Sequence, residues 1–167
     1  LFRSVTRISP EAPVQVFDIK KSEHKFGGAA NVSLNIKELG AEPVLIGVIG
    51  NDNEGSIIIE QMKNSGKTTI GILEEDKRPT TTKTRVIADS HHLLRIDSES
   101  KQNISEETEN RILGILKNDY YEIEAIILQD YNKGVLTKSL INNVIKFAND
   151  NNIKVLVDPK FYNFFEY

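Results

Sequence analysis

Apolar and polar positions in the first third of the chain follow the pattern of a layered α/β domain. Residues 29–39 mix apolar with polar side chains and end at Gly40, which predicts a compact helix. A second helix is predicted over residues 54–64, ending at Gly66. The nearly continuous apolar run between them, residues 44–50, predicts a strand buried on both faces, as in a parallel sheet. This order of elements is typical of a doubly wound α/β fold.

The pattern changes over residues 68–97, where threonine, valine and isoleucine are frequent and no helical period is present. Residues 80–88 and 92–97 predict two strands joined at Asp89-Ser90. Residues 14–19 begin with alternating apolar and polar positions and predict a further strand. These strands are too polar for a sheet covered on both faces, so we expect a small separate sheet with one exposed face.

The α/β pattern resumes at Ser105, whose hydroxyl is a good N-cap for a helix. Three glutamates follow in the first turn, where the helix dipole favours negative charge. Residues 125–128 predict a buried strand, and Thr137 is the expected cap of a helix that reaches about Asn151. Residues 155–157 predict another buried strand. Along the sequence, helices and buried strands are therefore predicted both before and after the polar strands.

Polar clusters follow three predicted strands, where open α/β sheets bind their ligands. They are residues 50–52, 130–134 and 158–160. Two of the clusters pair an aspartate with a nearby lysine: Asp130 with Lys133, and Asp158 with Lys160. Lysine neutralises phosphate and a carboxylate accepts hydrogen bonds from hydroxyls, so the pairs suit a phosphorylated, hydroxylated ligand. The aspartates could equally serve only as caps of turns.

A glycine pair opens the first predicted helix, with Asn31 in the first turn. Gly27 and Gly28 allow a ligand to approach the backbone, and a helix N-terminus offers unpaired N–H groups to an anion or a polar group. The pair could also be a simple turn. In the predicted hairpin, Lys83 and Arg85 share one face, which could cover an anionic ligand or face solvent.

Composition narrows the classes of partner. The 167 residues carry a net charge of −3, with 39% hydrophobic and 27% charged residues, so nucleic acid is an unexpected partner. No apolar run approaches the roughly 18 residues that a membrane span needs, and we expect no membrane partner. The absence of cysteine excludes disulfides and thiol catalysis and fits a cytoplasmic location. The three histidines lack a metal-binding spacing, so no metal ligands are predicted.

The glycine motif resembles the first signature of the ribokinase-like, or PfkB-type, carbohydrate kinase family. Residues 27–33 match that signature, with Gly40 and Gly50 at the expected distances. Further stretches are similar to the heptose 7-phosphate kinase branch of the family, and together they cover essentially the whole chain. These stretches are residues 7–14, 78–85, 93–97, 130–136 and 157–160.

The resemblance implies a Rossmann-like αβα core with a small β-sheet lid, as one partial domain over residues 1–167, incomplete at both ends. The core would comprise residues 27–67 and 104–167, and the lid about residues 12–26 and 68–97. The resemblance also implies transfer of the ATP γ-phosphate, with Mg²⁺, to O1 of D-glycero-D-manno-heptose 7-phosphate. That reaction belongs to ADP-heptose and lipopolysaccharide core synthesis. A cytoplasmic homodimer formed through the lid is the implied assembly.

The family's binding residues carry over onto three parts of this chain. The residues that match the sugar-contacting motif are Gly27, Gly28 and Asn31. Those at lid positions, which we expect at the substrate phosphate, are Lys83, Arg85 and Arg95. Asp130 and Lys133 match the loop that faces the substrate, and Lys160 is expected near phosphate.

The family's catalytic aspartate lies in a Gly-Ala-Gly-Asp motif at a helix N-terminus, and the chain has no such motif. We therefore expect residues 1–167 to represent the substrate side of a kinase and to transfer no phosphate alone. Two alternatives are another ribokinase-like kinase acting on an unphosphorylated sugar and a non-catalytic module for sugar-phosphate binding or dimerisation. A dinucleotide-binding domain is disfavoured because Gly-x-Gly-x-x-Gly is absent.

Overall fold

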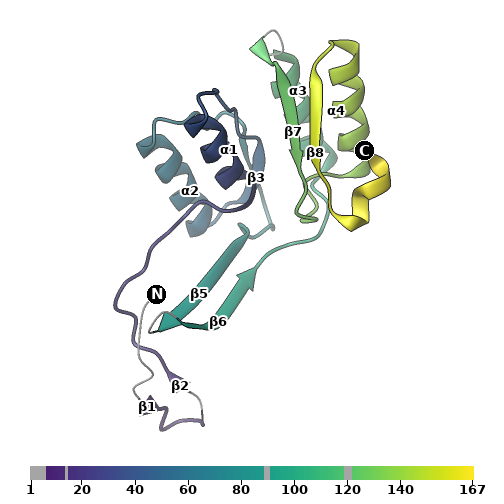
Figure 1. The fold of residues 1–167 in the computed structure, drawn as a ribbon. Coiled ribbons are helices and arrows are strands. Elements are labelled where there is room, and N and C mark those ends of the chain that lie inside the picture. Colours follow the sequence, from purple (N-terminus) through teal and green to yellow (C-terminus); the bar gives the residue numbers. More distant parts are fainter. Residues whose placement is uncertain (1–6, 14, 89–90, 119–121) are drawn as a thin grey trace. The chain divides into compact units, whose positions relative to one another are not determined.

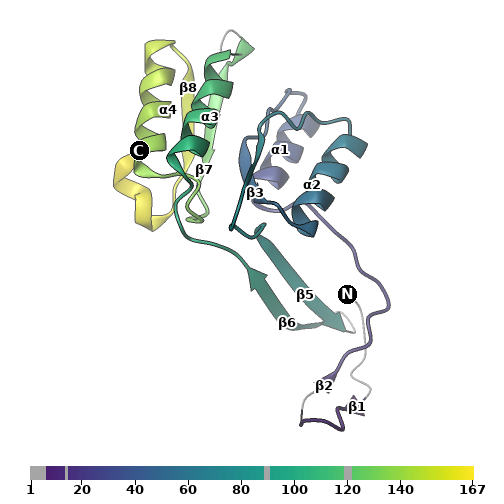
Figure 2. The same cartoon turned by 180° about the vertical axis from the view of Figure 1, so that it is seen from behind.

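The computed structural model describes residues 7–13, 15–88, 91–118 and 122–167. The chain divides into two compact units, one formed by residues 1–25 and 81–98 and the other by residues 26–80 and 99–167. Figure 1 and Figure 2 present their elements from opposite sides. The division separates the polar strands from the α/β elements.

The larger unit begins with the predicted helix–strand–helix order. Helix α1 spans Gly28–Glu38, strand β3 Gly47–Gly50, helix α2 Asn53–Asn64 and strand β4 Ile72–Glu75. Asp52 caps α2, since its Oδ1 accepts a hydrogen bond from the Gly55 amide at 2.8 Å. Strand β3 is shorter than the predicted run of residues 44–50. Val44 is exposed, and Pro43 before it has no N–H to donate to a neighbouring strand.

Strand β4 was not predicted. Its four residues, two apolar and two acidic, lie inside the segment that the sequence pattern assigned to the lid, but they pair in parallel with β3. Gly47 lies opposite Ile72, and Leu73 is buried in the core. A strand of this length gives no clear alternation, and its pairing with a strand more than twenty residues earlier is a long-range property.

The second part of the larger unit confirms the predicted alternation after Ser105. Its elements are α3 (Glu106–Asn118), β7 (Ala125–Gln129), α4 (Lys138–Asp150), β8 (Lys154–Asp158) and the 3-10 helix η2 (Phe161–Glu166). Strands β7 and β8 are parallel. Both predicted caps are present, because Ser105 Oγ accepts a hydrogen bond from the Thr108 amide at 3.2 Å and Thr137 Oγ1 from the Leu140 amide at 3.0 Å.

A hydrophobic core joins strands β4 and β7 with helices α3 and α4. Its buried members are Leu73, Ile104, Ile112, Leu116, Leu128, Leu140 and Val144. The expectation that β7 and β8 are buried strands is wrong for one of their faces, since Ile127 is 43% and Leu156 51% exposed. Helices α3 and α4 cover one face of the β7–β8 sheet (Figures 1 and 2), so the side chains that alternate to the other face remain exposed among the described residues.

The smaller unit contains two antiparallel strand pairs. Strand β1 (Arg7–Ile8) pairs with β2 (Gln15–Val16), and β5 (Thr82–Ala88) pairs with β6 (His91–Ser98). Among the described residues these pairs form separate two-stranded sheets and not the single sheet that we expected. The predicted turn at Asp89-Ser90 lies outside the described residues.

A close approach of two loops requires glycine at position 134. Gly134 has a φ of +76°, and a Cβ there would overlap the carbonyl oxygen of Gln102. The carbonyl oxygen of Gly134 accepts a hydrogen bond from the Ile104 amide at 2.9 Å. By contrast, a Cβ at Gly114, inside α3, would have no heavy atom of another group within 4 Å.

We expect opposite effects on stability from alanine at these two glycines. Gly134→Ala should lower the free energy of unfolding by about 2 kcal/mol or more, because it adds backbone strain and a clash. Gly114→Ala should raise it by about 0.5–1 kcal/mol, because alanine favours the helix and loses less entropy on folding. Urea denaturation of both variants tests this, and equal effects of the two changes would contradict the loop geometry.

Candidate functional site

The glycine pair and the loop that follows β7 meet in the structure. Gly27 caps α1 with extended backbone, and Gly28 has a φ of +53°. A Cβ on Gly28 would lie 3.3 Å from Cε2 of Tyr131, so the Tyr131 ring packs directly against this glycine. Asn31 lies one turn further along α1 with its side chain exposed. Two segments that are about one hundred residues apart thus form one edge of the larger unit.

Asp130 is engaged entirely by groups of the chain itself. The residue is 2% exposed, and its Oδ1 accepts a hydrogen bond from the Asn132 amide at 2.6 Å. Its Oδ2 accepts hydrogen bonds from Asn163 Nδ2 and Tyr167 Oη, both at 2.9 Å. The carboxylate therefore anchors the start of the loop to the C-terminal segment. Burial, and then the hydrogen bond and negative charge of Asp130, raise the pKa of Tyr167 above its ordinary value.

Sequence reasoning did not identify Asn163 and Tyr167 as partners of Asp130. Both lie in an aromatic-rich segment in which Phe161 and Phe165 are exposed, while Asn163 is buried. A buried amide among exposed aromatic side chains gives no periodic signal, and the contacts span 33 and 37 residues. Only the fold brings these groups together.

Lys133 is held through both its main chain and its side chain. Its carbonyl oxygen accepts a hydrogen bond from Arg78 Nη1 at 3.0 Å, and its ammonium group forms an ion pair with Glu99. The side chains of Lys133 and Glu99 are 22% and 20% exposed, so the pair remains accessible at its surface. Lys133 thus presents a cation whose position is fixed from two sides.

Arg78 and Glu75 form a mostly buried ion pair near this loop. Arg78 Nε lies 2.8 Å from Glu75 Oε2, and Glu75 Oε1 accepts a hydrogen bond from the Ser105 amide at 2.7 Å. Burial raises the pKa of Glu75, but the hydrogen bonds from Arg78 and Ser105 lower it by more, so the pKa lies below its ordinary value. Sequence analysis included Arg78 in a family-like stretch but gave it no role.

The C-terminal end of β3 is also fixed by a buried polar network. Asp52 accepts hydrogen bonds from the Thr80 hydroxyl at 2.6 Å and the Thr80 amide at 2.7 Å. The Gly50 amide donates to Thr80 Oγ1 at 2.9 Å. The first of the three polar clusters is therefore occupied by contacts within the chain, and a cap role for Asp52 agrees with them.

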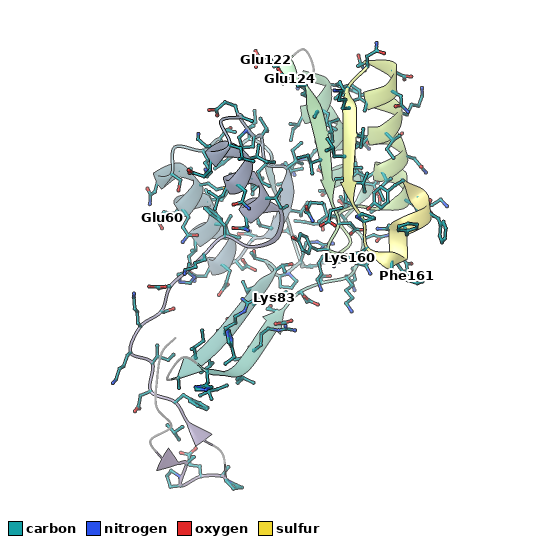
Figure 3. All side chains as sticks on the ribbon, in the orientation of Figure 1. Glu60, Lys83, Glu122, Glu124, Lys160 and Phe161 are labelled. Atoms are coloured by element: carbon teal, nitrogen blue, oxygen red, sulfur yellow. The ribbon has the colours of Figure 1, made fainter. Side chains whose placement is uncertain are left out.

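In the smaller unit, the β5–β6 register places four charged residues on one face. Lys83 lies opposite Asp97, and Arg85 lies opposite Arg95. Residues opposite each other, and residues two positions apart on one strand, share a face, so these four side chains lie on the same face. We call Lys83, Arg85, Arg95 and Asp97 the charged face; Figure 3 shows the Lys83 side chain on β5. The predicted sharing of a face by Lys83 and Arg85 agrees with this register.

Asp97 contacts two cations of the charged face. Its Oδ2 lies 2.8 Å from Lys83 Nζ, and its Oδ1 lies 2.9 Å from Arg95 Nε. The hydrogen bond from Lys83, followed by the charges of Arg95 and Lys83, lowers the pKa of Asp97 despite some desolvation. Since three cations face one carboxylate, the face keeps a positive excess that suits an anion.

Lys160 lies apart from these contacts at the start of η2. It is exposed and precedes Phe161, which is also exposed, and Figure 3 labels both. The third polar cluster is tied to the second, because the Asp130 amide donates to the Asp158 carbonyl oxygen at 3.1 Å. The structure therefore brings the two strand-end clusters together but gives Lys160 no described polar partner.

The described residues provide no metal centre of their own. Within residues 7–13, 15–88, 91–118 and 122–167, no group of three or more histidine, cysteine, aspartate or glutamate side chains could hold a metal ion. The partly buried carboxylate of Asp52 and the buried carboxylate of Asp130 accept hydrogen bonds from the protein. No helix in the described part of the chain has the length and apolar character needed to cross a membrane.

The class of fold follows from the arrangement of these elements. The model is similar to a crystal structure from E. coli, of a protein named a ribokinase II in its apo form, with a TM-score of 0.55 and 16% sequence identity. The match covers 86% of this chain and 47% of that chain. The chain thus has part of a ribokinase-like α/β fold.

The family model of the pfkB family carbohydrate kinases matches residues 3–164, and the chain belongs to this family. Its similar relatives include proteins named bifunctional protein HldE. Those of Sulfurimonas denitrificans and Geobacter sulfurreducens are 43% and 40% identical over 167 residues, and that of Helicobacter pylori J99 is 40% identical over 161. The matches cover 96–100% of this chain but only 34–35% of the relatives, so the chain spans about a third of their length.

Replacement of Glu75 should make stability less sensitive to acid. Because the pKa of Glu75 in the folded protein lies below its ordinary value of 4.5, the unfolded chain takes up the proton more readily. The stabilisation is therefore complete above about pH 4.5 and is lost as the pH falls through the folded pKa. The Glu75→Gln variant should unfold more easily than the wild type at pH 7, and the difference should shrink as the pH falls below 4.5.

Urea denaturation across this pH range measures the effect, with Glu60→Gln as the control. Glu60 is an exposed residue of α2 (Figure 3), so its replacement should leave the wild-type pH dependence almost unchanged. A constant difference between the wild type and Glu75→Gln over the whole range would contradict the assigned role of the Glu75 carboxylate.

Proposed function

We propose that this chain forms the acceptor-binding side of a sugar kinase that phosphorylates O1 of D-glycero-D-manno-heptose 7-phosphate. Membership of the carbohydrate kinase family supports a kinase, and the whole-chain similarity to the HldE proteins supports this branch of the family. The packing of Tyr131 against Gly28 carries the proposal, because it joins the glycine motif to the loop of the family-like stretch over residues 130–136.

The edge where Tyr131 packs against the Gly27-Gly28 pair, which we call the glycine edge, would bind the sugar. At Gly27 and Gly28 no Cβ blocks access to the backbone, and the start of α1 presents N–H groups with a partial positive charge. Asn31 is exposed one turn away and can donate and accept hydrogen bonds with hydroxyls. In this proposal the ring of Tyr131, which is partly exposed, forms the floor beside the sugar.

The charged face would bind the phosphate of the acceptor. Lys83, Arg85 and Arg95 supply cations, and Asp97 orients two of them by its contacts. Guanidinium groups form bidentate hydrogen bonds with phosphate, and these bonds are stronger than neutral ones. Lys133 and the exposed Lys160 are further cations that we assign to the phosphorylated ligands. Asp130 would hold the loop, since its oxygens are already engaged.

ATP is the proposed phosphate donor, with Mg²⁺ neutralising its phosphates, and none of the described residues is assigned to either. The reaction would occur in the cytoplasm.

A homodimer through the lid is part of the same proposal. It is supported by the second face of the β5–β6 hairpin, where Leu94 and Ile96 are exposed large apolar side chains. The mass of the complete protein in solution tests the dimer.

A kinase assay on the protein from the complete reading frame tests the proposed function. We expect phosphorylation of heptose 7-phosphate in preference to the unphosphorylated heptose, ribose and fructose. Residues 1–167 alone should transfer no phosphate. Phosphorylation of ribose or fructose without heptose 7-phosphate would favour another ribokinase-like kinase. Binding of heptose 7-phosphate without any transfer would favour a non-catalytic binding module.

The charged face should determine the preference for a phosphorylated acceptor. Replacing Lys83 and Arg85 with glutamine should raise the KM for heptose 7-phosphate by about 10- to 100-fold, because charge-assisted hydrogen bonds are lost. The KM for ATP and any activity on the unphosphorylated heptose should change little. Lys146→Gln, which removes an exposed lysine paired with Asp150 on α4, is the matched control. An equal loss on both acceptors would contradict this role.

A further inference from the structure

One guanidinium in the larger unit contacts three segments of the chain. The Arg78 side chain is 7% exposed, and its Nε lies 2.8 Å from Glu75 Oε2 on β4. Its Nη1 donates to the carbonyl oxygen of Lys133 at 3.0 Å, and its Nη2 donates to the carbonyl oxygen of Gln102. Gln102 follows β6 in the sequence, and Lys133 belongs to the loop after β7. Arg78 thus connects segments that are up to 55 residues apart.

The shape of the arginine side chain is necessary for these three contacts. A guanidinium is planar and has five N–H donors in a fixed arrangement, whereas the ammonium group of lysine is a single point of charge. Arg78 can therefore bind a carboxylate and two carbonyl oxygens in different directions at the same time. A lysine at this position would keep the charge and lose most of the geometry.

Glu75 is itself fixed, so it can fix Arg78. Its Oε1 accepts hydrogen bonds from the Ser105 amide at 2.7 Å and from the Thr108 hydroxyl at 3.2 Å, at the N-terminus of α3. The carboxylate thus belongs to both β4 and the start of α3. An ion pair whose carboxylate is held by two further donors has little freedom to change its geometry.

The loop that Arg78 contacts also contains Tyr131, whose ring packs on Gly28. The carbonyl oxygen of Lys133 binds Arg78, and that of the next residue, Gly134, binds the Ile104 amide at 2.9 Å. Tyr131 lies two residues before Lys133 and rests against Gly28. A shift of the Lys133 main chain would therefore move both the Tyr131 ring and the Lys133 ammonium group.

We propose that Arg78, with Glu75 as its fixed counter-ion, is a positioning residue for the acceptor sugar. It would set the place of residues 131–134 through the Lys133 carbonyl group, without itself contacting the sugar. This inference rests on the proposed function, because it assigns the acceptor to the edge formed by Gly28 and Tyr131. It extends that function by naming a residue of no assigned role that determines how well the acceptor fits.

The test is a comparison of two KM values in the protein from the complete reading frame. Arg78→Lys should raise the KM for heptose 7-phosphate by about tenfold, as expected for the loss of one or two hydrogen bonds at the loop. The KM for ATP should stay within about twofold, because Arg78 is proposed to position only the acceptor. General damage to the fold would instead raise the KM for both substrates. Lys146→Gln, at an exposed pair on α4, is the control and should change neither value.

The outcomes separate the inference from the proposed function. Unchanged acceptor KM in Arg78→Lys, or equal increases for acceptor and ATP, would overturn the positioning role. Should Arg78→Lys fail to fold, Glu75→Gln gives the same test, with a severalfold increase expected in the acceptor KM alone; equal changes for the two substrates would again overturn it. A wild-type protein that phosphorylates no sugar would instead reject the proposed function.

Discussion

The ion pair of Arg78 and Glu75 fixes the geometry of the larger unit where its loops meet. Both side chains are mostly buried, and breaking such a pair by removing one partner typically reduces stability by about 3–5 kcal/mol. This is a large share of the roughly 5–15 kcal/mol that stabilises a typical domain. The pair joins β4, the start of α3 and the Lys133 loop, so changes in any of these segments must preserve its contacts.

The chain carries two different kinds of surface, one in each of its units. In the larger unit, the Tyr131 ring packs beside the glycine pair, and the two glycines have no Cβ atoms, which suits close approach of a hydroxylated molecule. In the smaller unit, the charged face carries three cations and one carboxylate. A phosphorylated sugar needs both a surface for its hydroxyls and a surface for its phosphate. Each surface by itself suits one part of the acceptor that we propose, and the chain belongs to the carbohydrate kinase family.

Local signals predicted the helices and their caps, and long-range contacts account for what was missed. Ser105 and Thr137 were expected as caps because their bonding partners lie three residues away, within the same helix. Strand β4 escaped prediction because its pairing with β3 depends on the fold. The same is true of Asp130: its position after a strand was read from sequence, whereas its burial by Asn163 and Tyr167 was not. Residue spacing thus predicted a candidate site, and only the structure separated its residues that are held by internal contacts from those that are accessible.

Hydrogen exchange of the complete protein, with and without heptose 7-phosphate, tests the central claim most directly. The account predicts slower amide exchange on binding in three segments: residues 27–33, 83–97 and 130–136. The first and third contain the glycine edge and its loop, and the second contains the charged face. Exchange that is unchanged in all three segments at saturating sugar phosphate, or slowed only elsewhere in the protein, would contradict the claim that this chain binds the acceptor.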